Sequence, residues 1–133
     1  MKFKTIVLLF LSITLIYSCE KDESTNGGVD DFVGKYICRE ECSTNGNSTY
    51  SVEIKNTSTT ASEEVQIINF YNLGTNKSIM GQIDGFNINI PYQNYSNTFI
   101  SGNGTLNGTT ITLSFGVDDG NTNDSCSAVL TRQ

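Results

Sequence analysis

The stretch "ISGNGTLNGTTITLSF", residues 100–115, decides the fold class. Apolar residues alternate with small or polar ones on both sides of Asn107-Gly108, a dipeptide that favours a two-residue type I′ turn. With that turn, Leu106 lies opposite Thr109, and the apolar residues of both arms share one face. The stretch therefore predicts an antiparallel β-hairpin with one buried face.

A second hairpin is predicted at Asp84-Gly85 by the same kind of signal. With these two residues as the turn, Ile83 lies opposite Phe86, and the isoleucines of both arms fall on the face that excludes Asn87. A slip of one residue would expose each apolar set, so turn chemistry and apolar pattern support each other.

Short alternating segments recur along the rest of the chain, and no window keeps a helical period for long. We expect eight strands, at residues 34–42, 49–56, 64–71, 77–83, 86–91, 98–106, 109–117 and 126–133. Their spacing predicts an all-β domain, an eight-stranded antiparallel up-and-down meander barrel. A two-sheet β-sandwich is the alternative.

Three glycines interrupt the predicted strands opposite bulky residues: Gly81, Gly102 and Gly104. Glycine weakens a strand, so its presence there indicates either bends that let the sheet curl or space for a ligand inside. Curling is the interpretation that we favour.

Cys38, Cys42 and Cys126 are the cysteines of the predicted barrel. Cys38 and Cys42 lie in one predicted strand, about 13 Å apart at 3.3 Å per residue, which is too far for a disulfide. A bridge must therefore use Cys126. A zinc site would need a fourth ligand, which this histidine-free sequence does not supply, so we predict no metal site.

Pairing Cys42 with Cys126 sets the first strand antiparallel to the last and closes the barrel. Tyr36 then lies opposite Arg132. Pairing Cys38 with Cys126 would instead place half of the first strand against the polar loop 121–124, so Cys42–Cys126 is the predicted disulfide and Cys38 the odd cysteine.

The first predicted strand opens with Phe32-Val33-Gly34-Lys35-Tyr36, which resembles the Gly-x-Trp opening of lipocalin-like barrels. In that family the tryptophan packs under an arginine of the last strand. The resemblance implies that Tyr36 and Arg132 form the corresponding structural pair.

The N-terminus carries lysines at positions 2 and 4, an apolar run over residues 6–16, and Ser18 before Cys19. This pattern is typical of a secretory signal, and the run is too short for a permanent transmembrane helix. Ser18-Cys19 resembles the lipobox of bacterial lipoproteins, which implies a signal peptide at residues 1–18 and acylation of Cys19. Two or three acyl chains would anchor the protein stably in a membrane.

The residues that follow, "CEKDES" (19–24), resemble the export signal of surface-exposed lipoproteins in the Bacteroidetes phylum. This resemblance implies an outer-membrane lipoprotein that faces the cell exterior. We expect residues 19–30 to form a polar tether and residues 31–133 to form the barrel domain.

The whole chain has a net charge of −6, and loss of Lys2 and Lys4 with the signal peptide makes it −8. Such a surface repels nucleic acid, which we exclude as a partner. The sequence has no histidine, the commonest general base, and no catalytic or cofactor motif. We therefore expect a protein that is not an enzyme and needs no cofactor.

The segment "PYQNYSNTF", residues 91–99, is the candidate ligand-binding stretch. It mixes aromatic rings, which stack on sugar faces, with amides, which bond sugar hydroxyls, in a predicted connection between strands. The candidate residues are Tyr92, Gln93, Asn94, Tyr95 and Phe99. The alternative is that the aromatic side chains plug one end of the barrel.

These features predict a non-enzymatic binding module for a glycan or a small apolar molecule. The alternative is a protein-interaction module, either an accessory subunit of outer-membrane nutrient uptake or an enzyme inhibitor. The sequence leaves the oligomeric state open.

Overall fold

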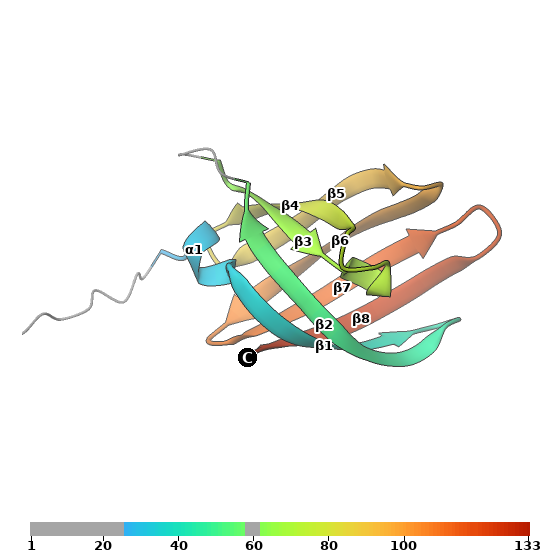
Figure 1. The fold of residues 1–133 in the computed structure, drawn as a ribbon, viewed down its shortest axis with the longest axis horizontal. Helices are drawn as coiled ribbons and strands as arrows, with labels where there is room; N and C mark the ends of the chain where they lie inside the picture. Colours follow the sequence, from blue (N-terminus) through green and yellow to red (C-terminus); the bar gives the residue numbers. More distant parts are fainter. Residues whose placement is uncertain (1–25, 58–61) are drawn as a thin grey trace, which may run out of the picture.

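The computed structural model describes residues 26–57 and 62–133, and in these ranges eight antiparallel strands form a closed up-and-down barrel (Figure 1). Each strand pairs with its sequence neighbours, and β1 pairs with β8 to close the barrel. The predicted fold class is confirmed, and the alternative sandwich is wrong. The strands are β1 (Gly34–Cys42), β2 (Gly46–Asn56), β3 (Glu64–Ile68), β4 (Ser78–Asp84), β5 (Asn87–Tyr95), β6 (Thr98–Asn107), β7 (Thr110–Asp118) and β8 (Asn123–Arg132).

Alternation of apolar and polar residues fills the interior, as the sequence pattern requires. In β7 and β8 every second side chain is buried, and Ile111, Leu113 and Leu130 are at most 1% exposed. Full burial of such a side chain contributes about 1.5–3 kcal/mol relative to an exposed one. The inward apolar residues therefore supply most of the stability of the fold.

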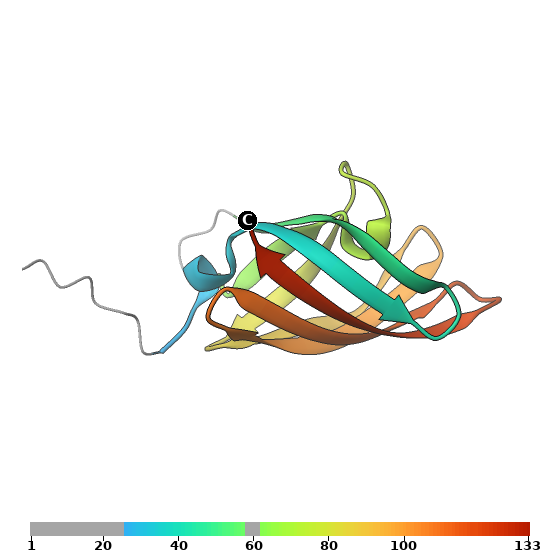
Figure 2. The same ribbon diagram turned by 90° about the horizontal axis from the view of Figure 1, so that it is seen from below.

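Two short helices pack against the barrel, one at an end and the other part-way towards the opposite end (Figures 1 and 2). The helix α1 (Val29–Phe32) lies at the end that carries the β4–β5 and β6–β7 turns, which we call the α1 end. The 3₁₀ helix η1 (Phe70–Asn72) lies towards the other end, the η1 end, and Phe70 packs on the Phe115 ring at 4.6 Å between centroids. No helix among the described residues is long and apolar enough to cross a bilayer.

Both predicted hairpins form, but the predicted register is wrong in each. Ile83 pairs with Ile88 rather than Phe86, and Leu106 pairs with Ile111 rather than Thr109. The two-residue turns are therefore Gly85-Phe86 and 108–109, one residue later than expected. Glycine comes first in each turn and alone has a positive φ (59° and 62°), as in a type II′ turn, whereas type I′ needs positive φ at both positions.

The shifted register explains two of the three strand glycines. Gly102 pairs with Phe115, and a Cβ on Gly102 would lie 2.5 Å from the Phe115 Cβ. Gly104 pairs with Leu113, and a Cβ there would lie 2.4 Å from a Leu113 methyl carbon. Side chains fill the space beside both glycines, so close packing in a curled sheet accounts for them.

The ladder between β1 and β8 has the predicted register. Cys42 pairs with Cys126 and the two form a disulfide, while Tyr36 pairs with Arg132. The Arg132 guanidinium carbon lies 5.4 Å from the centre of the Tyr36 ring, and the guanidinium donates a 2.8 Å hydrogen bond to the phenol oxygen. The phenol in turn donates to the Phe32 carbonyl at 2.7 Å, which ties α1 to the barrel.

Some element bounds differ from the prediction. β2 and β8 each begin three residues earlier than expected, and α1 was not predicted at all. β3 ends at Ile68 because Asn69 adopts a left-handed conformation (φ 62°), so the chain turns into η1 instead of continuing to Tyr71.

Candidate functional site

The candidate stretch is part of a strand, which corrects the prediction of a connection. β5 runs to Tyr95, and only Ser96 and Asn97, both with positive φ, form the turn to β6. The pairing of β5 with β6 shifts between Ile90 and Gln93, which marks a β-bulge. A bulge redirects the side chains around it, and bulges often lie next to functional sites.

Tyr92 and Phe99 form an aromatic pair on the outer face of the barrel. Their rings are stacked, with centroids 5.2 Å apart and planes 11° from parallel. Tyr92 is 72% exposed, so it does not plug the barrel as the alternative interpretation required. Phe99 is half-buried and supports the Tyr92 ring from one side, which leaves a flat aromatic surface open to solvent.

The side chains of Gln93 and Asn94 form hydrogen bonds within the protein. The Gln93 side chain accepts a 2.9 Å hydrogen bond from the Met80 backbone nitrogen and donates a 2.8 Å bond to the Met80 oxygen. The Gln93 side chain thereby takes the place of backbone pairing beyond the point where the β4–β5 ladder ends. The Asn94 side-chain oxygen accepts from the Asn97 backbone nitrogen at 3.1 Å and stabilises the turn.

Tyr95 lies apart from the aromatic pair. Its ring is half-buried, and the Lys77 ammonium group lies 5.4 Å from its centre. The structure therefore divides the five candidate residues into an exposed aromatic pair, two structural amides and a cation–π contact.

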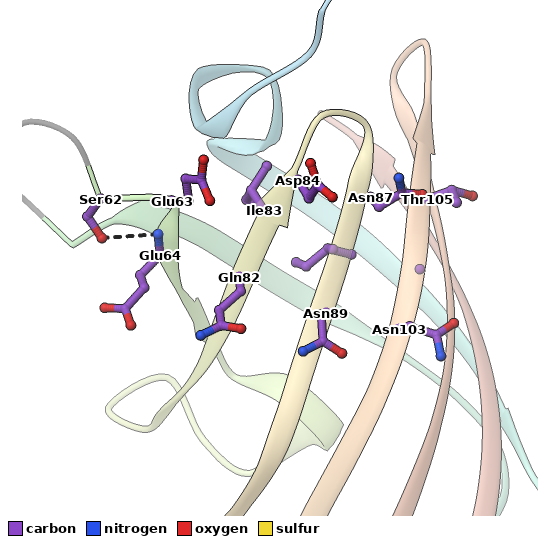
Figure 3. Close-up of a pocket in the computed structure, with 12 residues that line it drawn as sticks. Ser62, Glu63, Glu64, Gln82, Ile83, Asp84, Asn87, Asn89, Asn103 and Thr105 are labelled. Carbon is purple, nitrogen blue, oxygen red and sulfur yellow. Dashed lines mark hydrogen bonds between the residues drawn. The ribbon is translucent and has the colours of Figure 1, made fainter.

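An amide-lined groove of about 780 Å³ lies on the outer face of the barrel towards the α1 end (Figure 3). The strand register sets Gln82 of β4, Asn89 of β5 and Asn103 of β6 side by side in one row. The alternating pattern of the sequence put such residues on the outer face, but amides alone did not mark them as a site. The exposed polar side chains of the groove are Glu63, Glu64, Gln82, Asp84, Asn87, Asn89, Asn103 and Thr105.

The groove and the aromatic pair share the outer face of β5 and β6. Tyr92 follows Asn89 by three residues, about 10 Å along an extended strand. An extended polar ligand along β5 would thus meet amide hydrogen-bonding groups first and an aromatic face next.

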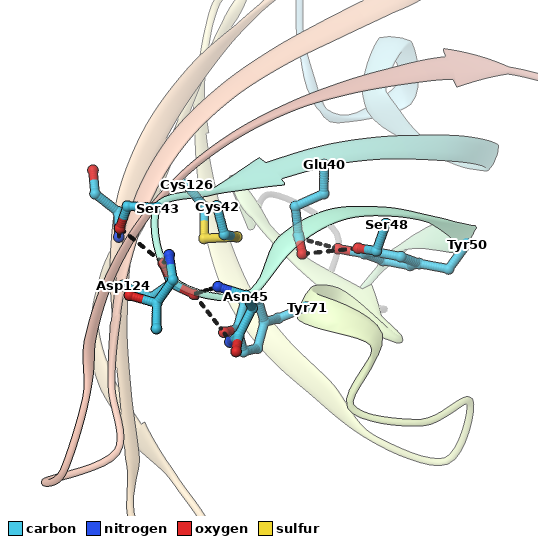
Figure 4. The surroundings of a disulfide bond; sticks show 11 residues. Glu40, Cys42, Ser43, Asn45, Ser48, Tyr50, Tyr71, Asp124 and Cys126 are labelled. Atoms are coloured by element: carbon cyan, nitrogen blue, oxygen red, sulfur yellow. Dashed lines mark hydrogen bonds between the residues drawn. A yellow bond between two sulfur atoms is a disulfide. The ribbon is translucent and has the colours of Figure 1, made fainter.

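A polar cluster surrounds the disulfide at the η1 end (Figure 4). The buried Asp124 carboxylate accepts hydrogen bonds from the Thr44 nitrogen at 2.8 Å, the Ser43 hydroxyl at 3.0 Å and the Tyr71 phenol at 3.1 Å. Burial opposes ionisation of Asp124, but these bonds outweigh it and hold the pKa below its usual value. Asp124 thus joins the β1–β2 turn, β8 and η1.

Glu40 is the second inward carboxyl group of this cluster. Its oxygens accept hydrogen bonds from the Tyr50 phenol and, at 3.2 Å, from the Ser48 hydroxyl. Burial raises the pKa of Glu40, and these two bonds oppose the rise only in part. Glu40 thus links β1 to Ser48 and Tyr50 of β2 inside the barrel.

The cluster does not fit a metal ion. Cys42, Asp124 and Cys126 bring three ligand atoms within 4.8 Å of one another, but the two sulfurs are bonded to each other and offer no thiolate. Cys38 is unpaired among the described cysteines and is buried, and burial raises its pKa to about 11. A thiol with that pKa is a poor nucleophile at neutral pH.

No family model matches the chain, and no curated protein matches it. Among solved structures, the chain is similar to a redesigned β-barrel, with a TM-score of 0.56 and 14% sequence identity. The match covers 83% of this chain and 98% of that chain. At this identity the likeness shows the fold alone, an eight-stranded β-barrel in the described residues.

Proposed function

We propose that this protein is a non-enzymatic binding module that holds a glycan on the outer face of β5 and β6. The observation that carries the proposal is the exposed Tyr92 ring, stacked on Phe99 and in line with the amide row of the groove. Aromatic faces stack on sugar rings, and amides both donate to and accept from sugar hydroxyls.

A ligand on the outer face has more support than a small apolar ligand in the interior. Phe115 and Leu113 fill the space beside Gly102 and Gly104, and Phe70 packs into the barrel from the η1 end. The lipocalin-like relationship remains part of this proposal for its barrel and its Tyr36–Arg132 pair, not for an internal ligand.

We also propose that the barrel is displayed on the outer membrane, facing the cell exterior, by acyl chains on Cys19. Cys19 lies outside the described residues, so the sequence pattern alone supports this step. The described chain begins at the α1 end, whereas Tyr92 lies in the part of β5 nearer the η1 end. A tether at the α1 end would leave the aromatic pair free to meet an external glycan.

The anchor is tested by expressing the full chain and its Cys19→Ala variant in a bacterium that processes lipoproteins. We expect the wild-type protein in the membrane fraction, with mass spectrometry showing an acylated N-terminal cysteine. The variant should lose the acyl mass and leave that fraction. An unmodified Cys19 in the wild-type protein would refute the anchor but not the binding site.

The binding site is tested with a glycan array, followed by titration of the strongest glycan into the purified protein. Tyr92→Ala should weaken binding about 10-fold, equivalent to about 1.4 kcal/mol, because the stacking surface is lost. Tyr92→Phe keeps the ring and should bind nearly as well. Phe86→Ala removes another exposed ring, 42% exposed at the β4–β5 turn, and serves as the matched control.

The other two classes of function give different results in the same experiments. An empty array together with a stable protein partner in purified membranes would favour the protein-interaction module. Turnover of a hydrolase substrate that depends on an acidic residue would identify an enzyme. Either result would contradict the proposed glycan site.

A further inference from the structure

The amide row of the groove begins with a carboxylate. Strand register sets Glu64 of β3 opposite Gln82 of β4. From Gln82 the row continues through Asn89 to Asn103, so it crosses four strands (Figure 3). At about 4.8 Å between neighbouring strands, the row is about 14 Å long. Its side chains are all exposed, so it presents an acidic group at the β3 end and amides along the rest of its length.

A second row of exposed polar side chains lies beside the first, nearer the α1 end. Asp84 of β4 pairs with Asn87 of β5, and Asn87 pairs with Thr105 of β6. Residues two apart on a strand share a face about 7 Å apart, so Asp84 lies next to Gln82. Glu63 adds a third carboxylate to the groove. Carboxylates therefore lie on the β3–β4 side of the groove, and amide and hydroxyl groups lie on β5 and β6.

No positive side chain of the protein balances these carboxylates. Among the described residues that line the groove there is no lysine or arginine. Glu63, Glu64 and Asp84 form no ion pair within the described ranges, where the ion pair joins Lys55 to Glu53 at 3.5 Å. The groove therefore has a negative potential that attracts a cationic ligand and repels an anionic one.

The amides of the groove are available to a ligand, unlike those of Gln93 and Asn94. Gln93 and Asn94 form hydrogen bonds to the backbone. The side chains of Gln82, Asn89 and Asn103 have no hydrogen-bond partner among the described residues, and they face solvent. Each amide group can both donate and accept. Free amides beside unpaired carboxylates fit a ligand that carries both hydroxyl and ammonium groups.

The carboxylates of the groove are spread out and are not gathered as metal ligands. A calcium ion needs six to eight oxygen ligands at about 2.3–2.6 Å. Among the described residues, only Cys42, Asp124 and Cys126 bring three possible ligand atoms together, and they lie at the η1 end. Glu64 and Asp84 lie on neighbouring strands and in different rows. This spacing fits several cationic groups along an extended molecule better than one metal ion.

The carboxylates lie at one end of the path that leads to the aromatic pair. β5 runs from Asn87, opposite Asp84, past Asn89 to Tyr92. These five residues span about 16 Å of extended strand. A sugar chain along β5 would therefore lie beside carboxylates at the α1 end and stack on Tyr92 at the other. Aromatic faces also attract ammonium groups, so positive charge on the chain is favourable at both ends.

We propose that the glycan bound on the outer face of β5 and β6 carries free amino groups, which Glu64 and Asp84 bind as ammonium ions. This inference rests on the proposed glycan site and names its ligand class. The two carboxylates determine specificity, while the amides bind hydroxyl groups and Tyr92 stacks on a sugar ring. Exposed ion pairs are individually weak, so the charges select between glycans more than they add affinity.

The test compares three hexasaccharides in calorimetric titrations with the purified protein at pH 6 and low salt. The first is β-1,4-linked glucosamine, whose amino groups are protonated, and the second is the same chain with every amino group acetylated. The third is a galacturonic acid chain, which is anionic. We expect the glucosamine chain to bind about 5-fold more tightly than its acetylated form, and the anionic chain to bind most weakly. The 5-fold preference should shrink in 0.5 M sodium chloride, because salt screens exposed charges.

Charge variants locate the preference in the groove. The double variant Glu64→Gln/Asp84→Asn removes two charges, keeps the side-chain size, and should bind the two glucosamine forms equally. Its affinity for the acetylated chain should stay at the wild-type value. Glu41→Gln is the matched control, because Glu41 is exposed on β1 outside the groove, and it should keep the preference. Tyr92→Ala should weaken the binding of both glucosamine forms.

Three results would overturn the inference, and they separate it from the proposed function. Equal binding of the two glucosamine forms by the wild-type protein, weakened in Tyr92→Ala, would keep the glycan site and remove its preference for amino groups. An equal loss of preference in Glu41→Gln and in the double variant would assign the attraction to the overall charge of the protein instead of the groove. Absence of binding to all three chains and to the glycan array would refute both proposals.

Discussion

The ladder between β1 and β8 and the ladder between β4 and β5 are held together in different ways. β1 and β8 pair without interruption from Tyr36 opposite Arg132 to Cys42 opposite Cys126, and each end has an extra link. β4 and β5 pair only from Gln82 to Asp84. Beyond that point a side chain, Gln93, supplies the hydrogen bonds to Met80 that a backbone would otherwise make.

The difference shows that the complete β1–β8 ladder stabilises the barrel, whereas the incomplete β4–β5 ladder leaves groups exposed for binding. The β1–β8 ladder joins residues far apart in sequence, and a covalent bond holds it closed. The incomplete ladder lies beside the feature that we assign to binding, because the bulge near Tyr92 follows the β4–β5 gap. Incomplete pairing leaves polar groups and aromatic faces available to a ligand.

The largest effect is expected from breaking the β1–β8 ladder with the double variant Cys42→Ala/Cys126→Ala. The disulfide closes a loop with a sequence separation of 84. In the chain-entropy model such a bridge contributes about 4–5 kcal/mol, and native disulfides typically contribute about 2–5 kcal/mol. We expect the free energy of unfolding, measured by urea denaturation, to fall by about that amount.

The control for this variant is wild-type protein treated with a reductant, which should shift to the same denaturation midpoint. Cys38→Ala leaves the disulfide intact and should lose less stability than the double variant. If the double variant and wild type unfold at the same urea concentration, the β1–β8 ladder does not depend on its covalent link.

A smaller effect is expected from Gln93→Ala at the β4–β5 gap. The substitution leaves the Met80 N–H and C=O without their partners, and an unsatisfied buried polar group costs about 1–3 kcal/mol. We expect the lower half of that range, because Gln93 is only half-buried. Amide hydrogen exchange at Met80 should accelerate.

Asn94→Ala is the matched control, because Asn94 bonds only its own turn. It should leave exchange at Met80 unchanged. Unaltered exchange at Met80 in Gln93→Ala would mean that β4 and β5 are held together there by something other than this side chain.

The same comparison explains which features could be predicted from the sequence. The register of β1 against β8 follows from the pairing of Cys42 with Cys126, which was preferred because pairing Cys38 with Cys126 would set half of β1 against the polar loop 121–124. The Tyr36–Arg132 pair follows from that register. The hairpin registers were wrong because the sequence does not reveal which glycine-containing pair forms the turn: Asp84-Gly85 or Gly85-Phe86, Asn107-Gly108 or 108–109. The alternating apolar pattern is the same in both cases, so the buried face was right although the partners were not.

The candidate site was predicted in part for a similar reason. Aromatic and amide residues in 91–99 were visible, but the bulge that turns Tyr92 outward and Gln93 towards Met80 depends on backbone geometry. The amide row of the groove comes from three strands and is assembled only by their register. The end of β3 depends on the left-handed conformation of Asn69, which the alternation of apolar residues does not indicate.

The smallest effect is expected from the two inward carboxyl groups at the η1 end, which should give opposite pH dependences. Glu40 has a raised pKa, so from its usual value of 4.5 up to the raised value the folded protein binds more protons than the unfolded chain. Stability therefore falls as the pH rises through this window. Asp124 has a lowered pKa: its contribution is present above the usual 3.8 and is lost as the pH falls towards the lowered value.

Glu40→Gln and Asp124→Asn separate the two contributions in urea denaturation between pH 2.5 and pH 8. Glutamine keeps an acceptor for the Tyr50 phenol and cannot ionise, so stability at neutral pH should rise by less than about 1 kcal/mol and the fall above pH 4.5 should flatten. Asparagine should lower stability at neutral pH and reduce the loss below pH 3.8. Wild-type pH profiles in both variants would show that neither carboxyl group couples protonation to the closure of β1 against β8.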